Sequence, residues 1–362
     1  MTTLQMRDAA MAPLASAQVA ETVGTKPSTP PLRSVAALYD GSPAARAALA
    51  PARALAARLD ADLVVIRVGT PEDSAAGLLA SSRSAATLEE AVSAAQAQGL
   101  RARGLEVAVP GGCAAAGALF EEMREHGAGL LVLATPTAPT APTAPAAYRS
   151  ADSSSCASPG GLVEAVMAQS RLPLLLVPPY YGSRTGDGAM QWLGWDGAAL
   201  AGGRAGHPSV PLRLLVALDG SPVAERALPL AAGLAQWVGA HLSLIRVVPA
   251  NSTLYCPGNG PRGAIENGLD YLQRVAMRLQ GDGVRPDAIR IAVRVGDAAE
   301  TLLSQAGREQ TAILMLAAPA SRGVSPGMGS SVTAHLLRRA PLPVLVVPAA
   351  ADVGGQTQPV PG

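Results

Sequence analysis

Aromatic side chains are scarce in this chain of 362 residues: six tyrosines, three tryptophans and one phenylalanine together make up 3% of it. Hydrophobic residues nevertheless reach 49%, because alanine is abundant. The hydrophobic cores must therefore be built from valine, leucine, isoleucine and alanine.

Other features that the sequence lacks exclude several classes of protein. No apolar run approaches the ~18–20 residues that cross a bilayer, and Arg7, Asp8 and Glu21 interrupt the N-terminal stretch where a secretory signal would need an apolar segment. The net charge is only +1, with basic residues dispersed, so no basic face indicates nucleic acid or anionic lipid. We expect a cytoplasmic protein that binds neither nucleic acid nor membrane. Three cysteines stand at no metal or redox spacing: Cys113, Cys156 and Cys256.

One segment of the chain occurs twice. Residues 40–68 align with 219–247 without a gap, which places one Asp-Gly-Ser-Pro motif over the other. The later segments match too, since RLPLLLVPP at 171–179 is similar to PLPVLVVPA at 341–349. A chain of this length is expected to hold two domains. The sequence therefore predicts a tandem repeat of one fold.

Strand and helix patterns alternate within each repeat. Short aliphatic runs, such as 213–218 and 311–318, are typical of strands buried on both faces. The apolar spacing over 264–280 predicts an amphipathic helix. Such alternation indicates an α/β fold with a parallel, doubly wound sheet of five strands in each repeat and helices on both faces.

Capping residues mark several predicted helix starts. In the second repeat, Ser221 suits the N-cap of the first helix, because the proline that follows has no N–H to leave unpaired. Asp297 and Glu300 form a capping-box signal for a later helix. Thr87 and Glu90 form the same signal in the first repeat, so a helix is expected to begin there.

The opening and closing residues of the repeats resemble one family. The Asp-Gly-Ser-Pro turn after an apolar first strand, Val-x-x-Gly-Asp before the third helix, and the closing APLPVLVVP resemble the universal stress protein family over about 32–180 and 210–350. The resemblance implies flavodoxin-like (Rossmann-like) domains and a cytoplasmic role in the stress response, often without catalysis. Tandem members resemble a fused form of the family homodimer. We therefore expect the two domains to form an intramolecular pseudo-dimer through their last strands, which would cover both sheet edges.

These observations predict the organisation of the chain. It comprises a flexible tail at 1–31, a first universal stress protein domain at 32–180 with a low-complexity Pro/Ala/Thr insert at about 138–159, a linker at 181–210, a second domain at 211–350, and a flexible tail at 351–362.

Some members of the family bind ATP, and the resemblance indicates where. In those members the first-strand aspartate and a second-strand valine hold adenosine, and the phosphates rest on a loop with the pattern Gly-x2-Gly-x9-Gly-(Ser/Thr). Small residues suit such a loop because backbone N–H groups and a helix N-terminus can then approach the anion. In the second repeat the pattern falls on Asp219, Val247, Ala317, Ala320, Ser330 and Ser331, so none of its three glycine positions holds glycine and the predicted nucleotide site is degenerate. A one-residue shift makes Gly329–Ser330 the terminal pair, and Arg322 lies within reach of a phosphate.

In the first repeat the same pattern is stretched. The aspartate is Asp40, and the loop would run from Ala134 and Thr137 to Gly160, more than twice the spacing that the family pattern allows. We therefore predict at most one site competent for ATP, in the second domain. The aspartates also have a simpler interpretation, which stays open, since an aspartate in such a turn often binds nearby backbone N–H groups.

The remaining motifs are weak. GNGPRG at 258–263 has the spacing of a dinucleotide fingerprint but lies away from its strand and contains a proline, so it predicts a flexible loop. Cys113 suggests either a helix-start thiol of lowered pKa or an inert one. The linker tryptophans Trp192 and Trp195 suggest packing onto a domain or a partner. Metal-ligand spacing is missing from the four histidines: His126, His207, His241 and His335.

We find no catalytic constellation and expect a non-catalytic, stress-linked regulatory protein that acts by binding. One alternative is a nucleotide-free module that binds an unknown protein partner through the insert and linker. A weak ATPase is the other. Association of whole chains into homodimers stays open.

Overall fold

The computed structural model describes residues 30–40, 42–69, 78–108, 114–135, 166, 169–178, 211–250, 260–318 and 332–349. Residues 1–29 of the first tail, the second tail, the whole low-complexity insert, the linker, the three cysteines, His207 and both linker tryptophans lie outside these residues, so the expectations placed on them stay untested.

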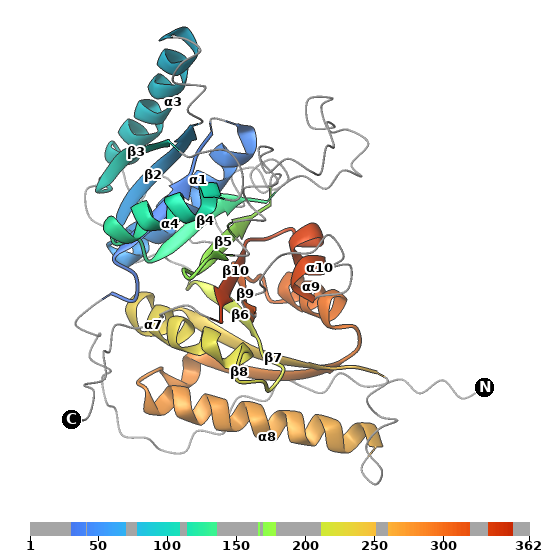
Figure 1. Ribbon diagram of the computed structural model, residues 1–362. Helices are drawn as coiled ribbons and strands as arrows, with labels where there is room; N and C mark the ends of the chain where they lie inside the picture. The colour runs from blue at the N-terminus through green and yellow to red at the C-terminus, as the bar shows by residue number, and fades with distance from the viewer. Residues whose placement is uncertain are drawn as a thin grey trace, which may run out of the picture.

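Strands and helices alternate in both repeats, as the sequence pattern predicts (Figure 1). The first repeat contains β1 (Ser34–Leu38), α1 (Pro43–Leu59), β2 (Asp62–Gly69), α3 (Leu78–Gln96), β3 (Ala102–Ala108), α4 (Ala114–Glu125), β4 (Leu130–Ala134) and β5 (Leu174–Val177). The second contains β6 (Arg213–Ala217), the 3-10 helix η2 (Ala224–Ala227), α7 (Leu228–Val238), β7 (His241–Val248), α8 (Gly260–Gly281), the 3-10 helix η4 (Pro286–Ala288), β8 (Ile289–Val295), α9 (Ala298–Arg308), β9 (Ile313–Ala318), α10 (Val332–Arg339) and β10 (Val344–Pro348).

The ten strands of the described residues belong to one sheet, in the order β3-β2-β1-β4-β5-β10-β9-β6-β7-β8. Within each repeat the neighbouring strands are parallel, and the order 3-2-1-4-5 is that of the first five strands of a Rossmann fold. The predicted doubly wound α/β fold is confirmed in both repeats.

The two repeats meet along β5 and β10, which pair antiparallel. The register sets Leu175 opposite Leu345, with Leu176 opposite Val344 and Leu174 opposite Val346. All of these side chains are buried. The last strands of the repeats therefore cover one another's edges, as expected from the need to protect them.

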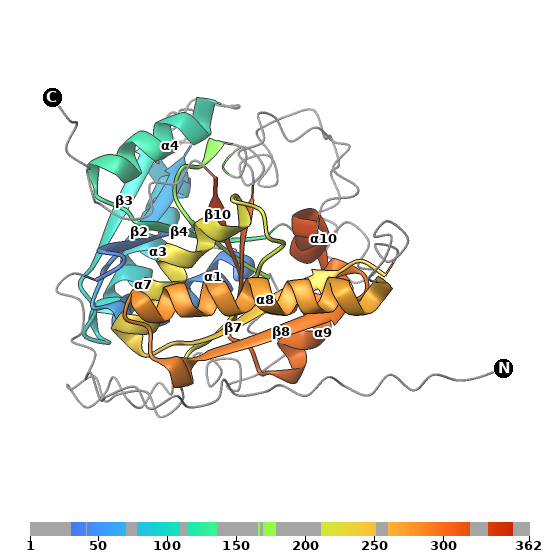
Figure 2. The ribbon, with the colours of Figure 1, turned by 90° about the horizontal axis from the view of Figure 1, so that it is seen from below.

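Helices cover both faces of the sheet (Figures 1 and 2). The hydrophobic core on each face runs through both repeats. Side chains of α1, α3, α7 and α8 pack on one face, and those of α4, α9 and α10 on the other. A second contact joins the repeats, because Pro31 packs against Gly233 of α7. The repeats consequently share their cores rather than standing apart.

Side chains cap the starts of two helices, and the cap at Asp297 confirms a prediction. Ser42 is the N-cap of α1 and its Oγ accepts a hydrogen bond from the Ala45 N–H. Asp297 is the N-cap of α9 and accepts from the Glu300 N–H at 3.0 Å. Side-chain caps of this kind satisfy N–H groups that have no partner within the helix.

The first helix of the second repeat departs from the prediction. Ser221 still accepts a hydrogen bond from the Ala224 N–H, but the chain forms the 3-10 turn η2 before α7 begins. Pro229 explains the break, since it has no N–H for the Glu225 carbonyl. That carbonyl instead accepts from the Leu228 N–H, three residues along.

Two other predictions were wrong. Thr87 and Glu90 lie inside α3, which already begins at Leu78, because the preceding leucine and alanine residues extend the helix past the capping signal. Residues 260–263 of the GNGPRG motif are the first turn of α8 rather than a loop. Among the described residues, no helix is long and apolar enough to span a membrane.

Candidate functional site

The candidate site lies where the strand order reverses in the second repeat. The chain passes from β6 outward to β7 and β8, then returns to β9 on the other side of β6. In open parallel sheets the crevice at this reversal, beyond the carboxyl ends of the strands, is the usual place for a ligand. Asp219 follows the end of β6 at this point, and Asp40 follows β1 at the equivalent point of the first repeat.

Both aspartates hold the turn that follows them. Asp40 Oδ1 accepts a hydrogen bond from the Ser42 N–H at 2.8 Å, and Asp219 Oδ1 accepts from the Ser221 N–H at 2.7 Å. The structure thus gives each aspartate the turn-forming role that the sequence left open. Asp219 is exposed, so holding the turn leaves it accessible.

The structure places two further predicted residues and leaves the others outside the described part of the chain. Val247 lies near the carboxyl end of β7 and packs on the face that carries α9 and α10. Ala317 lies in β9, opposite Val347 of β10, so it belongs to the sheet and not to the loop after it. The undescribed candidates are Ala320, Arg322, Gly329, Ser330, Ser331 and Gly160.

A cluster that the sequence analysis did not select stands beside Asp219. Arg246 of β7 lies over the ring of Tyr271 from α8, with its guanidinium carbon 5.2 Å from the ring centre. A Cβ placed on Gly220 would be 3.3 Å from Arg246 Nη1, so the guanidinium also lies against the Asp-Gly-Ser-Pro turn. Gly220 has φ +90°, which favours glycine there.

The same tyrosine is tied to η2. Its hydroxyl donates a hydrogen bond to Glu225 Oε1 at 3.0 Å, and Arg278 Nη2 lies 2.7 Å from Glu225 Oε2. Burial, followed by the hydrogen bond to Glu225, raises the pKa of Tyr271 far above its usual range. We call Glu225, Arg246, Tyr271 and Arg278 the Arg246 cluster. One signal pointed to it: the tripeptide Ile-Arg-Val recurs at the end of the second strand of each repeat, at 66–68 and 245–247.

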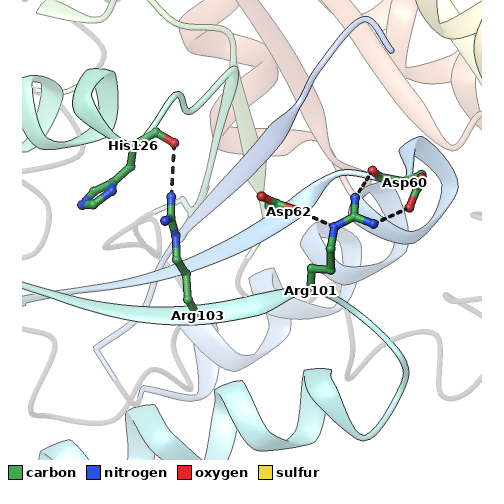
Figure 3. A network of polar contacts seen from close by, with 5 residues as sticks. All are labelled: Asp60, Asp62, Arg101, Arg103 and His126. Carbon is green, nitrogen blue, oxygen red and sulfur yellow. Dashed lines mark hydrogen bonds and ion pairs between the residues drawn. The ribbon is translucent and has the colours of Figure 1, made fainter. Parts of the chain in front are cut away.

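A different polar network lies at the opposite end of the strands in the first repeat (Figure 3). Arg101, just before β3, donates hydrogen bonds to the carboxylates of Asp62 and Asp60 at 2.7 and 2.9 Å. Arg103 donates to the backbone carbonyl of His126. The hydrogen bond to Asp62, followed by that to Asp60, raises the pKa of Arg101. The partners satisfy one another at the exposed amino end of the sheet, so the network joins strands and helices.

The described histidines sit apart from one another. His126 lies after α4, His241 at the start of β7, and His335 in α10 within 3.4 Å of Glu300. In the part of the chain that the structure describes, no three histidine, cysteine or acidic side chains are grouped as a metal ion would require.

Comparison with known proteins places the chain in a family. The model of the universal stress protein family matches residues 212–348. No curated protein matches the chain. The structure of a universal stress protein from Archaeoglobus fulgidus DSM 4304 is similar over 88% of this chain and 98% of its own, with a TM-score of 0.58 and 15% identity, which supports the two-repeat fold.

Two further solved structures resemble one repeat. A protein of the universal stress protein family from Burkholderia pseudomallei is 30% identical over 39% of this chain and 98% of its own, with a TM-score of 0.28. A universal stress protein in complex with cAMP is 20% identical over 39% of this chain and 99% of its own, with a TM-score of 0.31. Through residues 212–348, the chain belongs to the universal stress protein family.

Proposed function

We propose that this chain is a non-catalytic, cytoplasmic regulatory protein of the stress response, whose two repeats form an intramolecular pseudo-dimer and whose second repeat binds a nucleotide. ATP with Mg²⁺ is the first ligand to test, since the resemblance to ATP-binding members is carried by Asp219 and Val247. In this proposal the first repeat is a structural partner without a nucleotide.

The observation that carries the proposal is the position of Asp219. It stands exposed at the reversal of strand order between β6 and β9, the part of a doubly wound sheet where ligands bind. Its Oδ1 accepts a hydrogen bond from the Ser221 N–H. A carboxylate has a second oxygen, which is the group we assign to the ligand.

The two repeats supply a matched pair of variants. Asp219→Ala and Asp40→Ala each remove the same hydrogen bond to a turn, so their structural cost is similar. We expect ATP with Mg²⁺ to raise the Tm of the full chain and of Asp40→Ala, because binding to the folded state alone stabilises it. Asp219→Ala should lose that shift. An equal shift in both variants, or none in the unsubstituted chain, would contradict the proposal.

A further inference from the structure

The guanidinium of Arg246 has no hydrogen-bond partner among the described residues, although it is half-buried at the candidate site. The face of Tyr271 and the backbone at Gly220 hold it in place. An arginine carries five N–H donors in a planar fork, and no guanidinium nitrogen of Arg246 is buried without a partner, so these donors are open to solvent. Donors that are accessible and not used within the protein can bind a ligand with acceptor atoms.

The side chains around Arg246 restrict the movement of its guanidinium group. Tyr271 is fixed by its hydrogen bond to Glu225, and Glu225 is fixed in turn by Arg278. A guanidinium stacked on an immobilised ring loses little freedom when it forms hydrogen bonds. The Arg246 cluster therefore prepares two parallel donors for a ligand with two adjacent acceptors.

The charged groups near the guanidinium of Arg246 indicate which part of a nucleotide it contacts. Among the described residues of this site, the carboxylates of Asp219 and Glu225 equal in number the guanidinium groups of Arg246 and Arg278, so the cluster itself carries no positive surplus for a phosphate. The first helix also offers little to an anion, because the N–H groups of Ser221 and Ala224 are already hydrogen-bonded within the turn. An uncharged group with both donors and acceptors fits better, and in a nucleotide that group is the base.

We propose that Arg246 is a specificity-determining residue of the second repeat and makes its site prefer guanine to adenine. Arginine donates two parallel hydrogen bonds to O6 and N7 of guanine, whereas adenine presents an amino donor in place of O6. The guanine N1–H and amino group are donors that a carboxylate accepts, and Asp219 directly precedes Gly220, which lies against the guanidinium of Arg246. The inference rests on the proposed function, since it names the base that the nucleotide site selects.

The first repeat offers the matched control. Arg67 occupies the position of Arg246 in the aligned sequences. Its Nη1 is buried without a hydrogen-bond partner and lies 3.6 Å from a carboxylate oxygen of Glu106 on the neighbouring strand, with 13% of the side chain exposed. Arg67 thus has a charged partner within the protein. The same residue type at the same place therefore has different chemistry in the two repeats.

The test is a calorimetric titration of the full chain with GTP and with ATP, each with Mg²⁺. We expect GTP to bind about tenfold more tightly, within the range that one bidentate arginine contact gives. Arg246→Lys keeps the charge and loses the fork, so it should bring the two affinities together. Tyr271→Leu removes the ring and should do the same, while Arg67→Lys should keep the preference.

The outcomes separate the two proposals. Equal affinity for the two nucleotides, tighter binding of ATP, or a preference that survives Arg246→Lys overturns the guanine assignment and leaves nucleotide binding in place. Failure of both nucleotides to bind the full chain overturns the proposed function together with the inference.

Discussion

Leu175 of β5 and Leu345 of β10 lie directly opposite one another in the antiparallel pair that joins the two halves of the sheet. Both side chains are almost fully buried and belong to the same core, which extends across both repeats. The junction between the repeats is therefore built like the interior of a single domain.

This junction predicts that the repeats unfold together. Leu175→Ala and Leu345→Ala should each lower the free energy of unfolding by about 2–5 kcal/mol, the cost of truncating a buried leucine. Urea unfolding followed by circular dichroism should show one transition in each variant, shifted to lower urea. Two transitions, one of them unshifted, would show that the repeats fold independently.

The contact between Pro31 and Gly233 predicts that replacing this helical glycine by alanine lowers stability. Replacing a helical glycine by alanine usually stabilises a helix by about 0.5–1 kcal/mol. Gly117→Ala in α4 should do so, because nothing lies within 4 Å of its new Cβ. Gly233→Ala should destabilise the chain, because its Cβ would stand 2.7 Å from the Pro31 Cβ. Thermal unfolding gives the change in Tm for each variant. An equal rise in Tm for both would show that Pro31 does not pack on α7.

Substitution of Gly220 should weaken nucleotide binding in addition to lowering stability. Gly220→Ala and Gly239→Ala both place alanine at positive φ, so each should cost about 1–2 kcal/mol of stability. Only the Cβ at Gly220 contacts Arg246, since nothing lies within 4 Å of a Cβ at Gly239. Nucleotide titration should therefore show weaker binding in Gly220→Ala alone. Equally strong nucleotide binding by the two variants would contradict a role of Arg246 in the site.

His241 predicts a dependence of stability on pH. Partial burial, followed by the charge of Arg213, lowers the pKa of His241 below its ordinary value of 6.5. The unfolded chain then binds a proton more readily than the folded chain, so stability is retained above pH 6.5 and decreases as the pH falls below it. His241→Gln should show a smaller loss of Tm between neutral and acidic pH. A loss as large as that of the unsubstituted chain would exclude His241 as the cause.

The sequence predicted the fold well because the fold depends on periodic apolar patterns. The aliphatic runs of β6 and β9 are buried strands, and the matching ends of the repeats are the two strands that pair. Single capping signals were less reliable where neighbouring residues outside the motif compete with them. The capping signal at Thr87 was overridden by the helix formers before it, and the proline that interrupts the first helix of the second repeat had no counterpart in the pattern used to align the repeats.

The candidate site was only partly predictable. Asp219 follows from the motif, but Tyr271 reaches Arg246 only because α8 packs beside β7, a contact between residues far apart in the chain. Sequence alignment of the repeats placed Arg67 over Arg246 and gave no reason to expect a different chemical role for the two arginines. Their partners, Glu106 and Tyr271, come from elements that align less closely, so the difference between the two positions emerges only from the packing.

The central claim is that one repeat binds a nucleotide and the other does not. Calorimetric titration of the full chain tests it most directly, because the stoichiometry counts the competent sites. We predict one nucleotide bound per chain, with GTP or ATP as titrant, and loss of that binding in Asp219→Ala but not in Asp40→Ala. Two nucleotides per chain, or none, would contradict the account.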